Sequence, residues 1–288
     1  MGSVRRSVGW LLLLALVFSG CARQAPQVSP APSAAASQAP VLVGATADPT
    51  SAVIAELYAQ ALAARGRQAR VVEFEDDVNT LVSRLQAGEA DVAPAFAWTA
   101  AQDLQVDSEE PDALVSDLAA ALDGEVAVLQ PSKVDRAWSY VTTGTATSLD
   151  AMPNDSTLVG NTRWKSAPDG PEGLAAIYRA KPAVTVVDDA DDRLAKVKAG
   201  AIGAFDGTEP QGMDGSLTVL QDPRAMIAAD PQLALMRLDM SSDEVVLEVI
   251  QQLHAVLDNA VVVGIRQRAA TLGVQAAVTE WLAEHPLG

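Results

Sequence analysis

The stretch Val41–Gly66, VLVGATADPTSAVIAELYAQALAARG, decides the fold. It begins with a short apolar run typical of a buried strand, followed by a turn in which Pro49 suits the first turn of a helix. Gly66 is suited to end that helix. One face of the helix carries the apolar side chains of Val53, Ile54, Leu57, Tyr58, Ala61 and Leu62. The stretch therefore predicts the strand, turn and helix of an α/β protein.

The same pattern continues along the chain. Residues 68–74 predict a second strand, and Asp76 and Asp77 suit the start of a helix that Gly88 ends. The short run at 90–94 predicts a third strand. A β-α-β-α-β order predicts a parallel sheet covered by helices.

A second series of strands and helices follows. From Ser241 the chain is mostly helical, and Ser241 and Glu244 fit a capping box. Strands are predicted at 137–144, 156–161, 183–188, 201–205, 217–222 and 232–239, a short helix at 147–152, and longer helices at 171–180 and 191–200.

Two segments are similar to each other. SRLQAGEADVAPAF (83–96) and AKVKAGAIGAFDG (195–207) share a helix, an Ala-Gly stop, a short strand of small residues and a phenylalanine at its exit. This similarity indicates two α/β lobes built in the same way.

The N-terminus predicts export and anchoring. Residues 1–20 have a basic start and a short apolar run, which is typical of a signal peptide. FSGC (18–21) resembles the lipobox of bacterial lipoproteins, with Phe18 where leucine is usual, so we expect lipidation of Cys21. The alternative is an ordinary secreted protein with a free thiol. Residues 21–40 are rich in Pro, Ala and Ser, which indicates a tether from the extracytoplasmic face of the cell membrane.

The formal charge of −17 makes the chain strongly acidic, and without residues 1–20 it is two units more negative, at −19. Such a surface repels nucleic acid, so we expect no nucleic-acid partner. It is compatible with a cationic or zwitterionic small ligand, and equally with a plain solubility role.

No catalytic or metal-binding constellation is present in the sequence. His254 and His285 are the two histidines and have no ligand spacing around them, and no glycine-rich phosphate loop follows a strand. We expect no metal, no cofactor and no enzyme activity.

Three segments resemble the glycine betaine/carnitine/choline-binding lipoproteins of ABC importers. The first is Val41–Gly66. The second is LQAGEADVAPAFAWTA (85–100), where the family has Gly-Glu-x-Asp-Val and then Pro-Glu-Tyr-x-Gly-Thr. The third is PDGPEGLAAIY (168–178), close to the family's Asp-Gly-x-x-Gly-Leu.

The resemblance implies a two-lobed periplasmic-binding-protein-like α/β fold of type II with two crossover hinge segments. Lobe one would comprise residues 41–125 and 240–288, and lobe two residues 126–239. It also implies a ligand enclosed between the lobes and closure by a hinge motion.

The resemblance further implies an aromatic cage, because a quaternary ammonium group is held by aromatic faces. Phe96, Tyr140 and Phe205 fall on cage positions, whereas Asp230 falls near a fourth position that is aromatic in the family. Trp98 stands where the family has glycine, and Ala167 stands where it has an arginine. The acid at 230 and the missing arginine favour a cation without a carboxylate. Trp98, Trp138 and Trp164 are candidates to rebuild the aromatic wall, the alternative being that they pack within the lobes.

The predicted function is that of a monomeric, lipid-anchored solute-binding protein which serves an ABC permease and its ATPase subunit. One alternative is a binding-fold lipoprotein repurposed as a sensor or envelope accessory factor. Another is an envelope hydrolase that uses acids such as Asp169 or Asp206.

Overall fold

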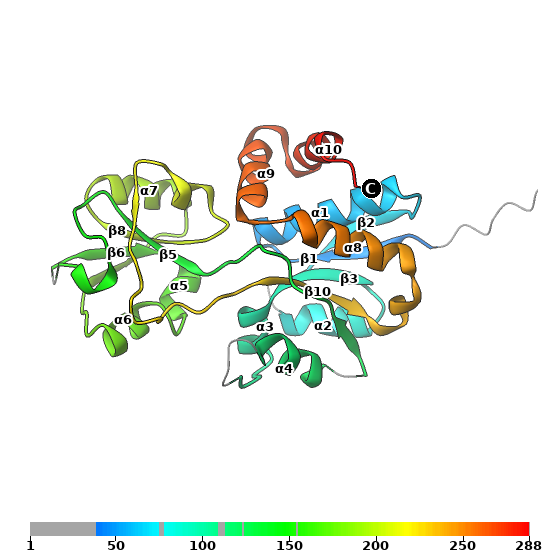
Figure 1. The fold of residues 1–288 in the computed structure, drawn as a ribbon, viewed down its shortest axis with the longest axis horizontal. Coiled ribbons are helices and arrows are strands. Elements are labelled where there is room, and N and C mark those ends of the chain that lie inside the picture. The colour runs from blue at the N-terminus through cyan, green and yellow to red at the C-terminus, as the bar shows by residue number, and fades with distance from the viewer. Residues whose placement is uncertain (1–38, 75–77, 109–112, 123, 154, 288) are drawn as a thin grey trace, which may run out of the picture. The chain divides into compact units, whose positions relative to one another are not determined.

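Two five-stranded sheets, each covered by helices, organise the chain in the computed structural model (Figure 1). The structure describes residues 39–74, 78–108, 113–122, 124–153 and 155–287, so the predicted signal peptide, Cys21 and most of the tether lie outside the described residues. Residues 38–288 form one compact unit. No described helix is long and apolar enough to span a membrane.

The first sheet, with its helices, is called lobe one. Its strands are, in order, β2 (Ala69–Glu73), β1 (Val41–Ala45), β3 (Val92–Phe96), β10 (Gln232–Arg237) and β4 (Val126–Val128). The predicted parallel pairing of the first three strands is confirmed, whereas β10 runs antiparallel to both β3 and β4.

Helices cover both faces of this sheet, which explains why its central strands β3 and β10 are apolar on both sides. The side chains of Ala234 and Met236 pack on one face of β10, and those of Leu233 and Leu235 pack on the other. The first face is covered by α1 (Pro49–Ala64), α8 (Glu244–Val256), α9 (Asn259–Leu272) and α10 (Val274–Glu284); the second is covered by α2 (Val78–Gln86), α3 (Ala97–Asp103) and α4 (Leu114–Ala121).

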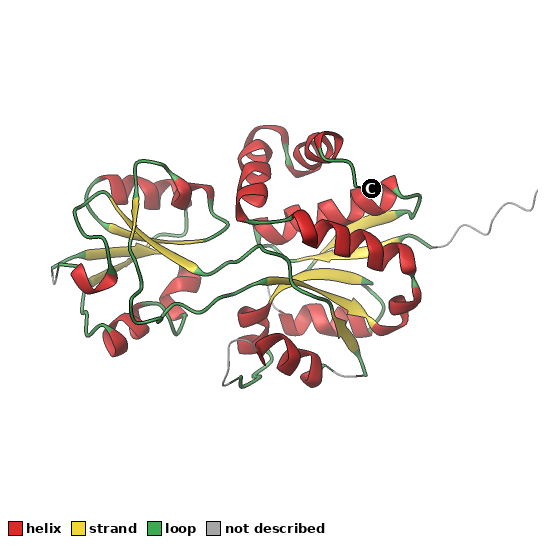
Figure 2. Cartoon of the chain, in the orientation of Figure 1, coloured by secondary structure: helices red, strands yellow, loops and turns green. Residues whose placement is uncertain are grey.

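The second sheet, with its helices, is called lobe two. Its strands are, in order, β7 (Ala183–Val186), β6 (Thr157–Gly160), β8 (Ile202–Asp206), β5 (Trp138–Thr142) and β9 (Thr218–Val219). The helices of lobe two are α5 (Thr162–Ser166), α6 (Pro171–Ile177) and α7 (Ala190–Lys198). Short 3-10 turns lie at Leu149–Ala151 and Pro210–Met213, and another follows β10 at Leu238–Ser242. Figure 2 shows the resulting alternation of helix and strand. The two-lobed α/β class is confirmed.

The similarity between residues 83–96 and 195–207 corresponds to an equivalent place in each sheet. The strands β3 and β8 both pair in parallel with one neighbour and antiparallel with the other. In both lobes the preceding helix ends at a glycine with positive φ, 72° at Gly88 and 105° at Gly200, a region that favours glycine.

Two segments connect the lobes, at residues 129–137 and 220–231, and they run antiparallel beside each other. Backbone hydrogen bonds join Ser132 N to Gln232 O at 2.8 Å and Arg136 N to Asp230 O at 3.0 Å. The crossovers therefore differ from the predicted boundaries at 125/126 and 239/240, because β4 and β10 belong to the first sheet.

The caps of two long helices show how local sequence sets the element boundaries. Asp48 accepts hydrogen bonds from Thr50 N and Ser51 N at the start of α1, with Pro49 in its first turn. The predicted capping box at Ser241 is wrong. Asp243 caps α8 by accepting from Val246 N, and Ser241 lies in the preceding 3-10 turn.

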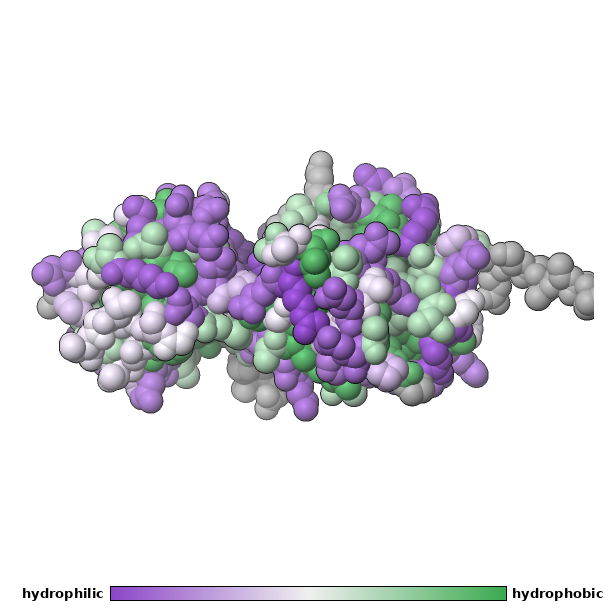
Figure 3. All heavy atoms as spheres, turned by 90° about the horizontal axis from the view of Figure 1, so that it is seen from above, coloured by the Kyte–Doolittle hydropathy of each residue, from purple (hydrophilic) through white to green (hydrophobic). Residues whose placement is uncertain are grey.

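The surface face seen in Figure 3 is mostly hydrophilic, with hydrophobic residues in small separate patches. The large exposed hydrophobic side chains of the described chain belong to several different elements, including Ile177 at the end of α6, Val219 in β9 and Val256 in α8. Isolated exposed apolar side chains of this kind are normal for soluble domains.

Candidate functional site

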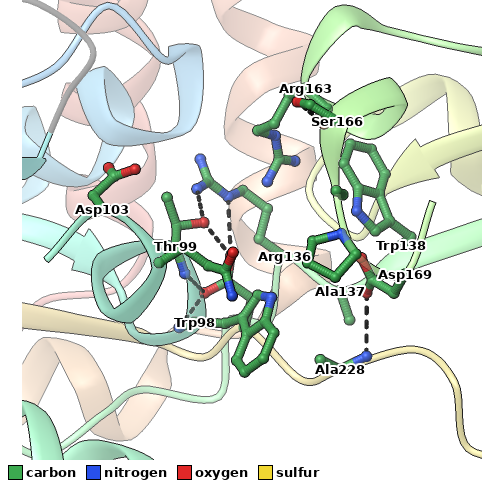
Figure 4. Close-up of a pocket in the computed structure, with 14 residues that line it drawn as sticks. Trp98, Thr99, Asp103, Arg136, Ala137, Trp138, Arg163, Ser166, Asp169 and Ala228 are labelled. Carbon is green, nitrogen blue, oxygen red and sulfur yellow. Dashed lines mark hydrogen bonds and ion pairs between the residues drawn. The ribbon is translucent and has the colours of Figure 1, made fainter. Parts of the chain in front are cut away.

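Residues of both lobes and both crossovers line a cavity of about 220 Å³, called the central cavity (Figure 4). Lobe one contributes residues along the length of α3, and lobe two contributes α5 and the loop after it. The lining residues are Trp98, Thr99, Gln102, Asp103, Arg136, Ala137, Trp138, Arg163, Ser166, Ala167, Pro168, Asp169, Ala228 and Asp230.

A second hollow of about 410 Å³ shares Thr99, Asp103, Arg136 and Arg163 with the central cavity and is called the side cavity. Phe96, the last residue of β3, lines the side cavity. The two arginines therefore border both spaces.

Asp230 caps the N-terminus of α3 from a distant part of the chain. This helix begins without a side-chain cap of its own at Phe96. Instead Asp230 Oδ1 accepts from Trp98 N at 2.8 Å and Thr99 N at 3.2 Å, and Oδ2 accepts from the Thr99 hydroxyl at 2.7 Å. Asp230 thus lines the central cavity and also fixes the position of Trp98.

Arg136 is buried at the centre of this arrangement, with a side chain only 5% exposed. Its guanidinium donates to Asp48 Oδ2 at 2.6 Å and to the Thr99 hydroxyl at 2.7 Å, and its Nε lies 3.5 Å from Asp230 Oδ2. Its Cζ lies 4.0 Å from the centroid of the Phe96 ring, within cation–π range.

Arg136 and Asp48 each stabilise the charged form of the other. Burial disfavours the charged guanidinium, but the nearby carboxylates of Asp48 and Asp230 outweigh that effect and hold the pKa of Arg136 above its usual value. Burial likewise disfavours the Asp48 carboxylate, yet Arg136 and Arg163 keep the pKa of Asp48 below its usual value. Arg136 and Asp48 are therefore both charged at neutral pH.

Arg163 of α5, in lobe two, likewise stacks on an aromatic ring and pairs with a carboxylate. Its Cζ lies 4.3 Å from the Trp138 ring centroid, and Nη2 donates to Asp206 Oδ2 at 2.9 Å. Burial and the positive charge of Arg136 lower the pKa of Arg163. Its side chain is 33% exposed and lines both cavities.

Asp169 also lines the central cavity. Oδ2 accepts from Ala228 N at 3.2 Å, whereas Oδ1 is buried with no hydrogen-bond partner in the part of the chain that the structure describes. Burial raises the pKa of Asp169. Because Asp169 lines the cavity and its Oδ1 has no partner among the described residues, its carboxylate is a candidate contact for a bound ligand.

Three predicted site residues line neither of these cavities. Tyr140 and Trp164 are fully buried in lobe two, where Trp164 Nε1 donates to the Tyr140 hydroxyl at 3.0 Å and that hydroxyl donates to Asp169 O at 2.8 Å. Phe205 is buried against α7 with Arg193 4.9 Å from its ring centroid. Tyr140 and Trp164 thus support the loop that carries Asp169.

The structure brings Trp98, Trp138 and Asp230 together at the central cavity and places Phe96 at the adjoining one. Sequence reasoning missed Arg136 and Arg163. Each lies within two residues of a tryptophan, Trp138 or Trp164, which is the one local signal that marks them.

The fold and the cavity between two lobes define a two-lobed solute-binding protein. A scan against known families matches residues 39–284 to the substrate binding domain of ABC-type glycine betaine transport systems. The chain belongs to this family of substrate-binding domains. It is a family of solute-binding proteins and not a class of enzymes.

Solved structures share the fold at low sequence identity. Apo YehZ from Escherichia coli has a TM-score of 0.67 and 15% identity, with 87% of this chain and 100% of that chain covered. A glycine betaine/carnitine/choline ABC transporter structure gives 0.74 and 12%, with 85% and 98% covered. A lactococcal protein in its closed form with glycine betaine gives 0.59 and 12%, with 85% and 95% covered. A search of curated proteins found no match.

Proposed function

We propose that this protein is a lipid-anchored receptor that binds a small zwitterionic solute of the quaternary ammonium type between its lobes and delivers it to an ABC permease. The observation that carries this proposal is the central cavity, which is lined by Trp98 of lobe one, Asp169 of lobe two and the partly exposed side chain of Arg163. The family of the chain supports the role in transport.

The chemistry of the cavity favours a ligand with both signs of charge. An alkylated ammonium group cannot donate an N–H hydrogen bond, so aromatic faces and carboxylates such as Trp98 and Asp169 suit it. A ligand carboxylate suits the guanidinium of Arg163. The absence of an arginine at Ala167 favoured a cation without a carboxylate, but Arg163, one helical turn earlier, supplies the missing group.

The structural relatives support the same ligand class. One of the solved neighbours is a choline-binding protein in complex with choline, with a TM-score of 0.53 and 12% identity, and another holds glycine betaine. The location also forms part of this proposal: lipidation at Cys21 would hold a monomer on the extracytoplasmic face, near its permease and ATPase subunit. Tethering raises the effective concentration of the receptor at its transporter.

Isothermal titration with glycine betaine, carnitine, proline betaine and choline tests the proposal. We expect saturable binding of the betaines, and a Trp98→Ala variant should lose roughly 3- to 30-fold in affinity, the range of one cation–π contact. Trp281→Phe, in the helical core of lobe one, is the control. If none of these solutes binds the wild-type protein, uptake of this class is not its function.

Anchoring is tested separately. Metabolic labelling with a fatty acid in a bacterial host should label the wild-type protein and leave a Cys21→Ser variant unlabelled and released from membranes. An unlabelled wild-type protein would contradict the lipoprotein part of the proposal and leave solute binding unaffected.

A further inference from the structure

Two aromatic faces that border the cavities already carry a cation that belongs to the protein. The guanidinium of Arg136 lies over Phe96 at 4.0 Å, and that of Arg163 lies over Trp138 at 4.3 Å. A bound ammonium group would need the same ring faces at a similar distance. A ring face covered by a guanidinium cannot accept a second cation, because the two charges would repel each other.

The carboxylates near these rings, which would attract a ligand cation, are likewise paired with the protein's own arginines. Asp48 and Asp230 flank Arg136, with contacts of 2.6 and 3.5 Å. Asp206 accepts from Arg163 at 2.9 Å. Each arginine thus combines with an aromatic face and at least one carboxylate, which is the set of groups that an alkylated ammonium group would use.

We propose that Arg136 and Arg163 are specificity-determining residues that close the Phe96 and Trp138 faces to a ligand's alkylated cation. The proposal rests on the proposed function in that it takes the central cavity as the solute site. In this arrangement Trp98 is left for the ligand cation, and the exposed part of Arg163 receives a ligand carboxylate. The pocket selects betaines over cations that lack a carboxylate, such as choline.

The two arginines differ in how firmly they are held. Arg136 is 5% exposed and contacts Asp48, Thr99 and Asp230, so its removal takes the ion-pair partner from two carboxylates. Arg163 is 33% exposed, and among the described residues it forms one ion pair, with Asp206. Arg163→Ala is therefore the principal variant, and Arg136→Ala is the second.

The chain offers a matched control. Arg224 lies over the Tyr178 ring at 5.1 Å and pairs with Asp150 at 3.0 Å, and its side chain is 48% exposed. It has the same stacked and paired geometry, but it lies outside both cavities. Arg224→Ala removes an equal charge without changing either cavity.

The experiment is calorimetric titration of the wild type and the three variants with choline, tetramethylammonium and glycine betaine. We expect Arg163→Ala to gain roughly tenfold or more in affinity for choline and tetramethylammonium and to lose affinity for glycine betaine. Arg224→Ala should match the wild type. Thermal unfolding of each variant shows whether it is folded. If Arg136→Ala does not fold, the affinities of Arg163→Ala alone test the inference.

The outcomes separate this inference from the proposed function. A folded Arg163→Ala variant that gains no affinity for either cation relative to Arg224→Ala overturns the inference, even if the wild type binds betaines. If the wild type binds none of the probes but Arg163→Ala acquires choline binding, the inference stands and the proposed ligand class is wrong.

Discussion

At the scale of single residues, a substitution at Asp169 tests whether a negative charge at the cavity contributes to ligand binding. Its Oδ1 has no partner among the described residues, and Oδ2 is held by Ala228 N. We predict that Asp169→Asn retains the hydrogen bond to Ala228 but loses roughly tenfold in betaine affinity, because the negative charge near the ligand cation is removed. Titration calorimetry measures this. Asp150→Asn, an exposed acid paired with Arg224, should leave the affinity unchanged.

A second residue-scale prediction concerns pH. His254 of α8 is buried, contacts the Tyr58 hydroxyl through Nε2 and Gln130 O through Nδ1, and burial lowers its pKa. The unfolded state therefore binds more protons below about pH 6.5, so this contribution to stability is present above that pH and lost as the pH falls towards the folded pKa.

Urea unfolding of the wild type between about pH 7.5 and 5 should therefore show a larger loss of unfolding free energy than His254→Gln shows over the same range. The acidic groups contribute to both curves, so the difference between them is the measured quantity. Parallel curves for wild type and His254→Gln would contradict the assignment.

How much of the site the sequence predicts depends on the kind of residue. Phe96 and Trp98 follow a predicted strand, so their place near a sheet edge could be inferred from the local pattern. Arg136 could not, because its position over Phe96 depends on the crossover that carries it from a distant part of the chain. Tyr140 and Trp164 show the converse: aromatic residues near a predicted site that form a buried hydrogen-bonded pair in lobe two.

At the scale of elements, β6 and α5 pack closely where Gly160 meets the ring of Trp164. A side chain at Gly160 would place its Cβ 2.1 Å from the Trp164 ring. We predict that Gly160→Ala lowers the unfolding free energy by about 1–3 kcal/mol, because Trp164 must shift within a packed core. Gly264→Ala in α9, where an added Cβ meets nothing within 4 Å, should raise it by about 0.5–1 kcal/mol. Urea unfolding of both variants measures the contrast.

The elements themselves were largely predictable because apolar periodicity and glycine stops are local signals. The direction of β10 was not, since a strand's partners depend on the return of the chain from lobe two. The start of α8 depended on which of two nearby side chains reached the free N–H groups, and Asp243 rather than Ser241 does so.

At the scale of the whole molecule, direct contacts between the lobes accompany the crossovers. The hydroxyls of Thr50 in α1 and Thr208 in lobe two lie 2.8 Å apart, both buried, and Arg266 of α9 donates to Thr208 O at 2.6 Å. A hinged protein whose closed state is favoured by such contacts binds its ligand more tightly.

We predict that Thr208→Val weakens solute binding roughly 3- to 10-fold, because it removes the hydrogen bond between the hydroxyls of Thr50 and Thr208. The same change removes the contacts of the Thr208 hydroxyl with Asp206 and Arg266, and it leaves the Arg266 contact with the Thr208 backbone in place. Small-angle scattering of the ligand-free variant should show a larger radius of gyration than the wild type. Thr218→Val, on the exposed strand β9, is the control. Unchanged scattering and affinity in Thr208→Val would show that this contact does not bias closure.

The order of strands in the first sheet has a consequence for how the nascent protein folds. The strands β3 and β4 are not neighbours, because β10 lies between them. Every strand of lobe two, by contrast, comes from the continuous stretch between β5 and β9. As the chain emerges N-terminus first, the second lobe can complete its sheet while β4 still lacks a partner. The lobe that begins first is therefore completed last, once β10 and the C-terminal helices have followed.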